Sequence, residues 1–77
     1  MKYPLVTVVW DDACSSGRWQ SIAELTGTPK RCNTTGYLLK KTKESVVVSH
    51  TVSADGDTCC ELTIPTQMVR VVTRLRK

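Results

Sequence analysis

The sequence predicts an all-β fold with a minor helix, in which five short strands close into a small barrel. Valine dominates the apolar positions and phenylalanine is absent, and a β-branched core favours strands over helices. Short apolar runs are separated by turn-forming residues along the chain, which is typical of small β-proteins. A chain of 77 residues makes one domain at most, so we expect residues 1–77 to form a single barrel without long exposed strand edges.

The first strand is predicted at residues 5–10, and a long irregular segment follows it at residues 12–31. Within that segment, Ser21 and Glu24 have the spacing of a capping box, and Gly27 would end the short helix that they begin. We expect one face of the strand to carry Val6, Val8 and Trp10, and the helix to carry Ile22 and Leu25 on its apolar edge.

The remaining apolar runs predict strands at residues 35–41, 45–53, 59–64 and 69–75. Polar residues 41–44 suit a hairpin connection, and residues 54–57 form a strong turn signal. Pro65 begins a tight one-turn 3-10 element before the last strand, because proline cannot continue a strand ladder. On the last strand we expect the core face to carry Val69, Val71 and Leu75, and the outer face to carry Arg70, Arg74 and Arg76.

This order of elements, with a long first loop and a 3-10 turn before the last strand, predicts an SH3-like barrel. An OB-fold is the nearest alternative. It would need a longer helix between its third and fourth strands than residues 54–58 can supply.

Catalysis has little support in the sequence. His50 is the only histidine, has no evident partner, and is expected to be a structural residue on an apolar strand face. Asp11 and Asp12 are adjacent and would diverge rather than act as an acid–base pair. Cys14 lies in a loop without a neighbouring base, and no glycine-rich phosphate loop exists. We therefore expect no enzyme activity, no catalytic residue and no cofactor.

The four cysteines are expected to be reduced thiols of a cytosolic protein. No C-x-x-C pair is present, so no metal site is expected, and Cys59 and Cys60 should point to opposite faces of a strand. We expect no signal peptide, because residues 1–4 lead directly into the first strand, and no run approaches the roughly 20 apolar residues of a membrane span.

Candidate ligand-binding residues gather in the long first loop. Trp10 and Trp19 flank it, and both offer flat surfaces for stacking. Arg18, Lys30 and Arg31 belong to the same segment and would give an aromatic floor cationic rims, which suits nucleotides and phosphates. The structural alternative places Trp10 in the core and uses Trp19 to pin the loop to the barrel.

The formal net charge of +4 suits an anionic small ligand, an acidic protein surface or weak nucleic-acid binding, and it also suits simple solubility. Besides the loop, two basic stripes occur, one at Lys40, Lys41 and Lys43 and one at Arg70, Arg74, Arg76 and Lys77. Three separate basic patches do not trace one groove, which weakens a duplex-binding interpretation.

Several short motifs follow one another along nearly the whole chain: Trp10-Asp11-Asp12-Ala13, Trp19, Cys32, Thr35-Gly36-Tyr37-Leu38, Val46-Val47-Val48, Ile64-Pro65 and Leu75. This order resembles a widespread group of small uncharacterised bacteriophage proteins with a Trp-x-Asp-Ala start, a Ser/Thr-x-Gly-aromatic-Leu middle and an Ile-Pro end. The polar segment 57–61 departs from that pattern.

The resemblance implies a phage accessory protein in the cytoplasm of the infected bacterial host, of the kind that counters host defence or redirects host machinery. It carries over no catalytic residue. It leaves open whether Trp10, Asp12, Gly36 and Pro65 are structural; Gly36 would allow a bend and Asp12 would cap backbone amides.

The leading expectation is a non-enzymatic protein that sequesters an anionic nucleotide immune signal, such as a cyclic oligonucleotide or an ADP-ribose derivative. So small a barrel encloses little, so the ligand would lie at a subunit junction of a homo-oligomer. Two alternatives stay open: a protein-binding inhibitor of a host enzyme or CRISPR effector, and a module for single-stranded nucleic acid.

Overall fold

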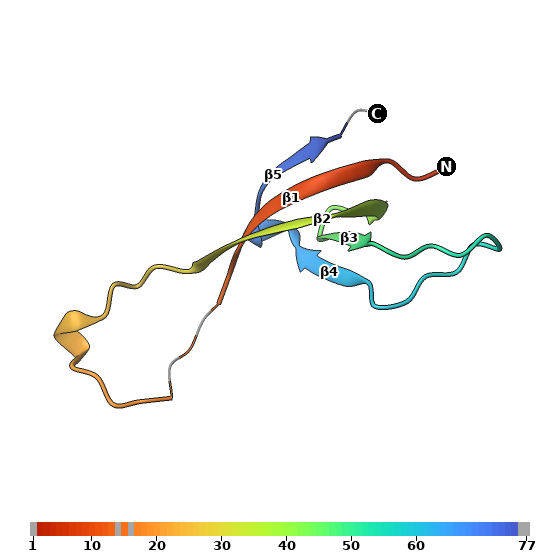
Figure 1. Ribbon diagram of the computed structural model, residues 1–77. Coiled ribbons are helices and arrows are strands. Elements are labelled where there is room, and N and C mark those ends of the chain that lie inside the picture. Colours follow the sequence, from red (N-terminus) through yellow and green to blue (C-terminus); the bar gives the residue numbers. More distant parts are fainter. Residues whose placement is uncertain (1, 14, 16, 76–77) are drawn as a thin grey trace.

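The computed structural model describes residues 2–13, 15 and 17–75 and consists mainly of one antiparallel sheet (Figure 1). Its strands are β1 (Leu5–Asp12), β2 (Lys30–Lys41), β3 (Ser45–Ser49), β4 (Leu62–Pro65) and β5 (Val69–Arg74). Two 3-10 turns, η1 (Ile22–Glu24) and η2 (Thr66–Met68), are the only helical segments in the described part of the chain, and neither could cross a bilayer. The mostly-β prediction with a 3-10 turn before the last strand is confirmed.

The strands are arranged in the order β4-β3-β2-β1-β5, so β4 and β5 are the two edges of the sheet. The predicted closure into a barrel is not confirmed, because no backbone pairing joins β4 to β5 among the described residues. β4 has four residues and ends at Pro65, which has no backbone N–H to donate. The turn η2 then carries the chain across to the opposite edge of the sheet.

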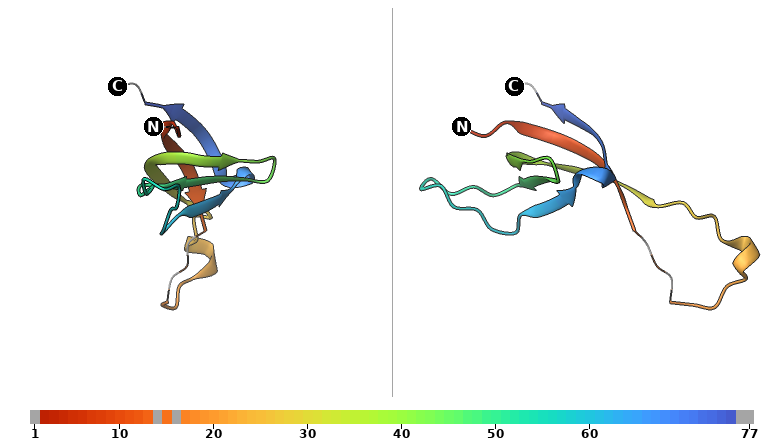
Figure 2. Two further views of the ribbon diagram at one scale, coloured as in Figure 1. Left: turned by 90° about the vertical axis from the view of Figure 1, so that its right-hand side faces the viewer. Right: turned by 180° about the vertical axis from the view of Figure 1, so that it is seen from behind.

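The core lies inside the curl of this sheet (Figure 2). Its five buried side chains are Val6 and Val8 of β1, Val46 and Val48 of β3 and Ile64 of β4. Alternate residues of a strand share a face, which explains the pairs at i and i+2. Strands β1 and β3 are not neighbours in the sheet, so they share one cluster only because the sheet between them curls.

The third and fourth strands are shorter than predicted. β3 ends at Ser49, so His50 lies outside the strand and is exposed, and its predicted place on an apolar strand face is wrong. β4 begins at Leu62, because Cys60 has a left-handed backbone with φ of 58° that a strand cannot continue.

The predicted facing of β5 holds for Val69, Arg70 and Arg74 but is wrong for Val71, Val72 and Leu75. Trp10 pairs with Val69 and Val9 pairs with Val71, so Arg70 is the extra residue of a β-bulge. A bulge shifts the alternation by one position. As a result Val72 packs against the core together with Val69, whereas Val71 is 48% exposed. Leu75 is 38% exposed, and Arg76 lies outside the described residues.

The predicted short helix is a single 3-10 turn. Ser21 precedes η1 but makes no side-chain capping bond, so the expected capping box does not form. Ile22 and Leu25, predicted as the apolar edge of a helix, are 85% and 57% exposed. A three-residue turn so far from the body has nothing to bury them against.

Two long connections project from the sheet and give the molecule principal extents of 52 × 24 × 21 Å (Figures 1 and 2). We call residues 13–29, between β1 and β2, the arm. We call residues 50–61, between β3 and β4, the tongue. The tongue is held by a bridge between Val52 and Thr58 and by a hydrogen bond of 2.7 Å from Ser53 N–H to the Asp57 carbonyl.

Gly36 allows β2 to approach the end of β3 closely. It is buried, and a Cβ at this position would lie 2.8 Å from the carbonyl oxygen of Ser49. Carbon and oxygen atoms do not approach this closely without displacement of the backbone. Glycine is therefore required here by close packing.

We expect Gly36→Ala to lower the free energy of unfolding by about 1–3 kcal/mol, as overpacking of a tight core does. Gly17→Ala is the matched control, because a Cβ added at Gly17 would meet nothing within 4 Å. Its effect should stay within about 0.5 kcal/mol. Urea denaturation of both variants checks this, and equal effects would contradict the close-packing explanation.

Candidate functional site

The arm is the candidate site, and it begins where β1 and β2 stop pairing. The two strands stay in register from the pair Leu5 and Tyr37 to the pair Asp12 and Lys30. β1 is thus two residues longer than predicted, and β2 starts five residues earlier. This long ladder carries the arm away from the curled part of the sheet (Figure 1).

An ion-pair cluster fixes the base of the arm. The carboxylate of Asp11 accepts a hydrogen bond of 2.5 Å from Arg31 Nε and another of 3.3 Å from Arg70 Nη1. These contacts connect β1 with both of its neighbouring strands. Hydrogen bonding to the Arg31 guanidinium is the main cause that lowers the pKa of Asp11, with a further contribution from Arg70.

Trp10 lies on the face of β1 opposite to Asp11, where its side chain contributes to the packing of the fold. It packs against the core cluster, and its indole Nε1–H donates a hydrogen bond of 3.0 Å to Thr34 Oγ1 on β2. The indole is therefore half-buried and satisfied at the end of the core. The core contact and the bond to Thr34 explain the position of Trp10 without a ligand carried by the arm.

Trp19 has the opposite environment. Its exposed fraction is 102%, so the side chain rests on no other part of the protein. Trp19 therefore does not pin the loop to the body, as the structural alternative would require. Arg18 of the arm and Lys30, the first residue of β2, are also exposed.

The predicted binding residues are brought together only in part. Trp10 and Trp19 do not share one surface, because the first packs on the core and the second projects from the arm. The guanidinium of Arg31 is bound to Asp11. Arg18, Trp19 and Lys30 remain accessible to a partner.

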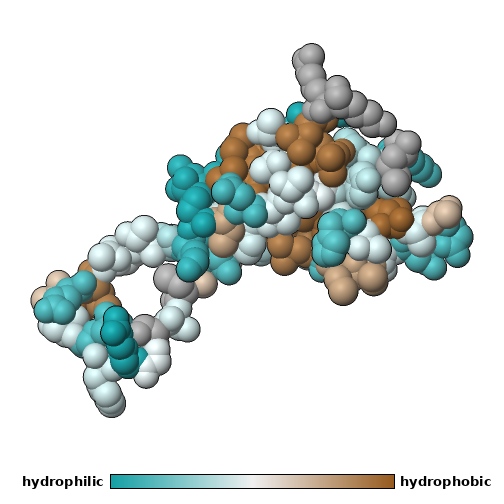
Figure 3. Space-filling view, in the orientation of Figure 1, coloured by the Kyte–Doolittle hydropathy of each residue, from teal (hydrophilic) through white to brown (hydrophobic). Residues whose placement is uncertain are grey.

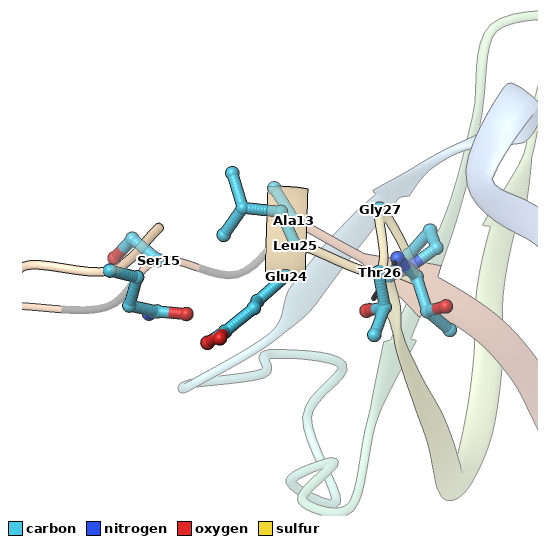
Figure 4. Close-up of a pocket in the computed structure, with 9 residues that line it drawn as sticks. Ala13, Ser15, Glu24, Leu25, Thr26 and Gly27 are labelled. Carbon is cyan, nitrogen blue, oxygen red and sulfur yellow. Dashed lines mark hydrogen bonds between the residues drawn. The ribbon is translucent and has the colours of Figure 1, made fainter. Parts of the chain in front are cut away.

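A pocket of about 540 Å³ lies between the two limbs of the arm. Figure 4 shows lining residues from both sides, with Ala13 and Ser15 on the outgoing limb and Glu24 to Gly27 on η1 and the returning limb. The space-filling view shows an opening through the arm, so this pocket is not enclosed (Figure 3). The lining consists of Ala13, Ser15, Gln20, Glu24, Leu25, Thr26, Gly27, Thr28 and Pro29.

The chemistry of this lining is neutral to acidic. Among the described lining residues, Glu24 is the one charged side chain, and none is a lysine or arginine. Such a lining suits an apolar or uncharged group better than a phosphate, which is held by cations and N–H donors.

Sequence reasoning missed Ile22 and Leu25 as site residues. Their spacing is that of the inner edge of a helix, which predicts burial. The signal that they are exposed is the length of the segment, because only four residues lie between Ser21 and Thr26 and Gly27 follows at once. A segment this short cannot form the three turns that stabilise an isolated amphipathic helix.

The other candidate groups lie apart from the arm. Cys59 and Cys60 are exposed near the base of the tongue, and Cys32 is half-buried on β2. Among the described residues, no three His, Cys, Asp or Glu side chains come together as a metal site would require. Cys14 and the end of the C-terminal basic stripe, Arg76 and Lys77, lie outside the described residues.

No family model matches this chain, and no curated protein or solved structure matches it either. The resemblance to small bacteriophage proteins therefore depends on the quoted motifs alone and stays a prediction.

The Asp11 cluster predicts a specific titration. We expect Arg31→Ala to raise the pKa of Asp11 more than Arg70→Ala does, because the Arg31 contact is shorter. NMR titration of the carboxyl carbon measures both. In the folded protein the pKa lies below the ordinary 3.8, so the ion pair stabilises the fold fully above that value. The stabilisation is lost as the pH falls through the lowered pKa. An Asp11 pKa that neither substitution changes would contradict the assignment.

The bond between Trp10 and Thr34 gives a second prediction. Trp10→Phe and Thr34→Val should each lower the free energy of unfolding by about 1 kcal/mol, the usual contribution of one such hydrogen bond. The double variant should lose less than the sum of the two, because both changes remove the same bond. Additive losses in chemical denaturation would show that the bond contributes nothing.

Proposed function

We propose that this chain is a non-enzymatic binding protein whose arm docks on a protein partner. The observation that carries the proposal is the set of three large apolar side chains, Trp19, Ile22 and Leu25, that project from the arm with exposed fractions of 102%, 85% and 57%. All three lie within seven consecutive residues and none has a place in the core.

Exposed apolar side chains gathered on one segment are typical of interaction surfaces. Tryptophan is enriched among the residues that dominate binding energy at protein interfaces. Burial of roughly 200 Å² of tryptophan surface at about 25 cal/mol per Å² would gain about 5 kcal/mol before the costs of association. Trp19 is thus the expected anchor, with Ile22 and Leu25 beside it.

A protein partner fits the arm better than the nucleotide ligand that the sequence favoured. The aromatic floor lacks Trp10, and Arg31 is held by Asp11. The pocket has Glu24 in its lining and stays open, whereas sequestration of a nucleotide needs enclosed phosphate-binding groups. Two other ligands therefore become alternative outcomes of the test. One is a nucleotide at the junction of a homo-oligomer, and the other is a single nucleic-acid strand bound to Arg18, Trp19 and Lys30.

The proposal also includes the type of fold, the origin of the protein and the type of partner. The strand order and the 3-10 turn before β5 support an SH3-like arrangement that is open rather than closed. The motif resemblance would make this a phage protein acting in the cytoplasm of the bacterial host. The partner would then be a host enzyme or defence protein that the arm blocks.

The test is capture of partners from bacterial lysate on the immobilised full-length chain, compared with Trp19→Ala. We expect the native chain to retain a stoichiometric protein that the variant loses. With the partner purified, Trp19→Ala should weaken binding at least about 30-fold, which corresponds to about 2 kcal/mol. The unfolding free energy of the variant should not change, because Trp19 contributes nothing to the core.

Lys43→Ala is the control, since Lys43 is exposed at the hairpin between β2 and β3, away from the arm. It should bind the partner as the native chain does. A partner that Trp19→Ala retains undiminished would overturn the proposal. A co-purifying nucleotide without a protein partner would support sequestration instead, and affinity for single strands that falls steeply with salt would support nucleic-acid binding.

A further inference from the structure

A pair of adjacent thiols lies where the tongue returns to the sheet. Cys59 and Cys60 stand just before β4 and are both free and exposed (the segment precedes the β4 arrow in Figure 1). They belong neither to the arm nor to the core. Nothing in the proposed docking of the arm uses them.

The backbone at Cys60 does not have the strand geometry that would separate the two thiols. In an extended strand they would point to opposite faces, as the sequence predicts. Cys60 instead has a φ of 58°, which interrupts the strand and cancels the alternation. The nearby charge of a Cys60 thiolate is the main cause that raises the pKa of Cys59, so the two thiols are close enough to influence each other.

We propose that Cys59 and Cys60 form a redox-active vicinal dithiol, which a small-molecule disulfide such as oxidised glutathione converts into an intramolecular disulfide. One protein thiolate attacks a sulfur of the glutathione disulfide, forms a mixed disulfide and releases one glutathione thiolate. The second protein thiolate then attacks the protein sulfur of that mixed disulfide and releases the other glutathione. The protein pair loses two protons and two electrons, and one oxidised glutathione becomes two reduced molecules.

The second step is favoured when Cys60 forms the mixed disulfide. The charge of a Cys60 thiolate opposes ionisation of Cys59, as the direction of the Cys59 pKa shows. A sulfur in a mixed disulfide carries no charge, so this repulsion ends and Cys59 ionises more readily. The two cysteines are adjacent in the chain, which makes closure of the ring an intramolecular reaction.

The disulfide would be strained and therefore easily reduced. Adjacent Cα atoms lie about 3.8 Å apart, whereas cysteines in unstrained disulfides are usually separated by about 4.4–6.8 Å. Strained and exposed disulfides are the labile ones that respond to redox conditions. The pair is thus suited to reversible oxidation and not to a permanent structural link.

Oxidation would be transmitted to the tongue through Ser49. The eight-membered ring of a vicinal disulfide contains the peptide group between the two cysteines, so closure twists that group. Its carbonyl, that of Cys59, lies 3.1 Å from the hydroxyl of Ser49, which is 3% exposed. The same hydroxyl accepts a hydrogen bond of 3.2 Å from Thr51 N–H. A displaced Cys59 carbonyl therefore disturbs the group that fixes the start of the tongue.

The test exposes the full-length protein to oxidised glutathione, and then measures the mass of the tryptic fragment 44–70, which contains Cys59 and Cys60 and no other cysteine. We expect this fragment to lose two hydrogens and to regain them in excess reduced glutathione. Cys59→Ser and Cys60→Ser should each carry one glutathione on the remaining thiol. Cys32→Ser is the control and should form the disulfide as the native chain does.

A native fragment that stays a dithiol, or that carries one or two glutathiones without closing, would overturn the proposal. Amide hydrogen exchange gives a second measurement. Exchange at Thr51 should become at least tenfold faster in the oxidised native protein and stay unchanged in oxidant-treated Cys60→Ser. Equal exchange at Thr51 in the oxidised and reduced native protein would overturn the transmission through Ser49.

Discussion

The structure depends on one small apolar cluster in which β1, β3 and β4 meet. Only five side chains in the described part of the chain form its buried centre: Val6, Val8, Val46, Val48 and Ile64. The first two come from a strand that is not adjacent to β3, so the sheet must curl to bring them into contact. Gly36 belongs to the strand between them, and its missing side chain permits the close approach of that strand to Ser49 at the end of β3.

So small a core also explains what stays outside it. A 77-residue chain buries a modest fraction of its surface, and the curl is filled by side chains of its own strands, including Trp10, and of η2. The arm begins beyond the Asp11 ion pairs, where no further layer exists to cover it. The fold therefore leaves Trp19, Ile22 and Leu25 exposed to water. Exposed apolar surface of this kind is unfavourable unless another molecule covers it, so these side chains are candidates for contact with a partner.

The sequence predicts the strands well where two-residue alternation governs them. Val6 and Val8, and Val46 and Val48, are buried as that alternation requires. The prediction of which side chains face the core fails where one extra residue shifts the two-residue alternation. The bulge at Arg70 reverses the expected facing of Val71 and Val72, and a local pattern does not reveal which residue a partner strand leaves unpaired.

The candidate site is less predictable for a different physical reason. The sequence indicates the long loop and its tryptophans, but Ser21 and Glu24 signal a helix that local bonds alone cannot stabilise. Whether Arg31 is free or bound depends on the register that places it opposite Asp11. The left-handed backbone of Cys60 likewise follows from the path of the tongue, and it removes the strand alternation that the sequence predicts for the two thiols.

The open edges of the sheet have a consequence for how copies of this chain meet. An unpaired edge strand invites pairing with another chain unless something obstructs it. Here the short edge strand β4 ends in Pro65, and the other edge is bent by a bulge and carries the positive charges of Arg70 and Arg74. Both edges thus discourage continuous sheets across molecules, so the fold tolerates being open without the risk of polymerisation that a flat, uncharged edge would bring.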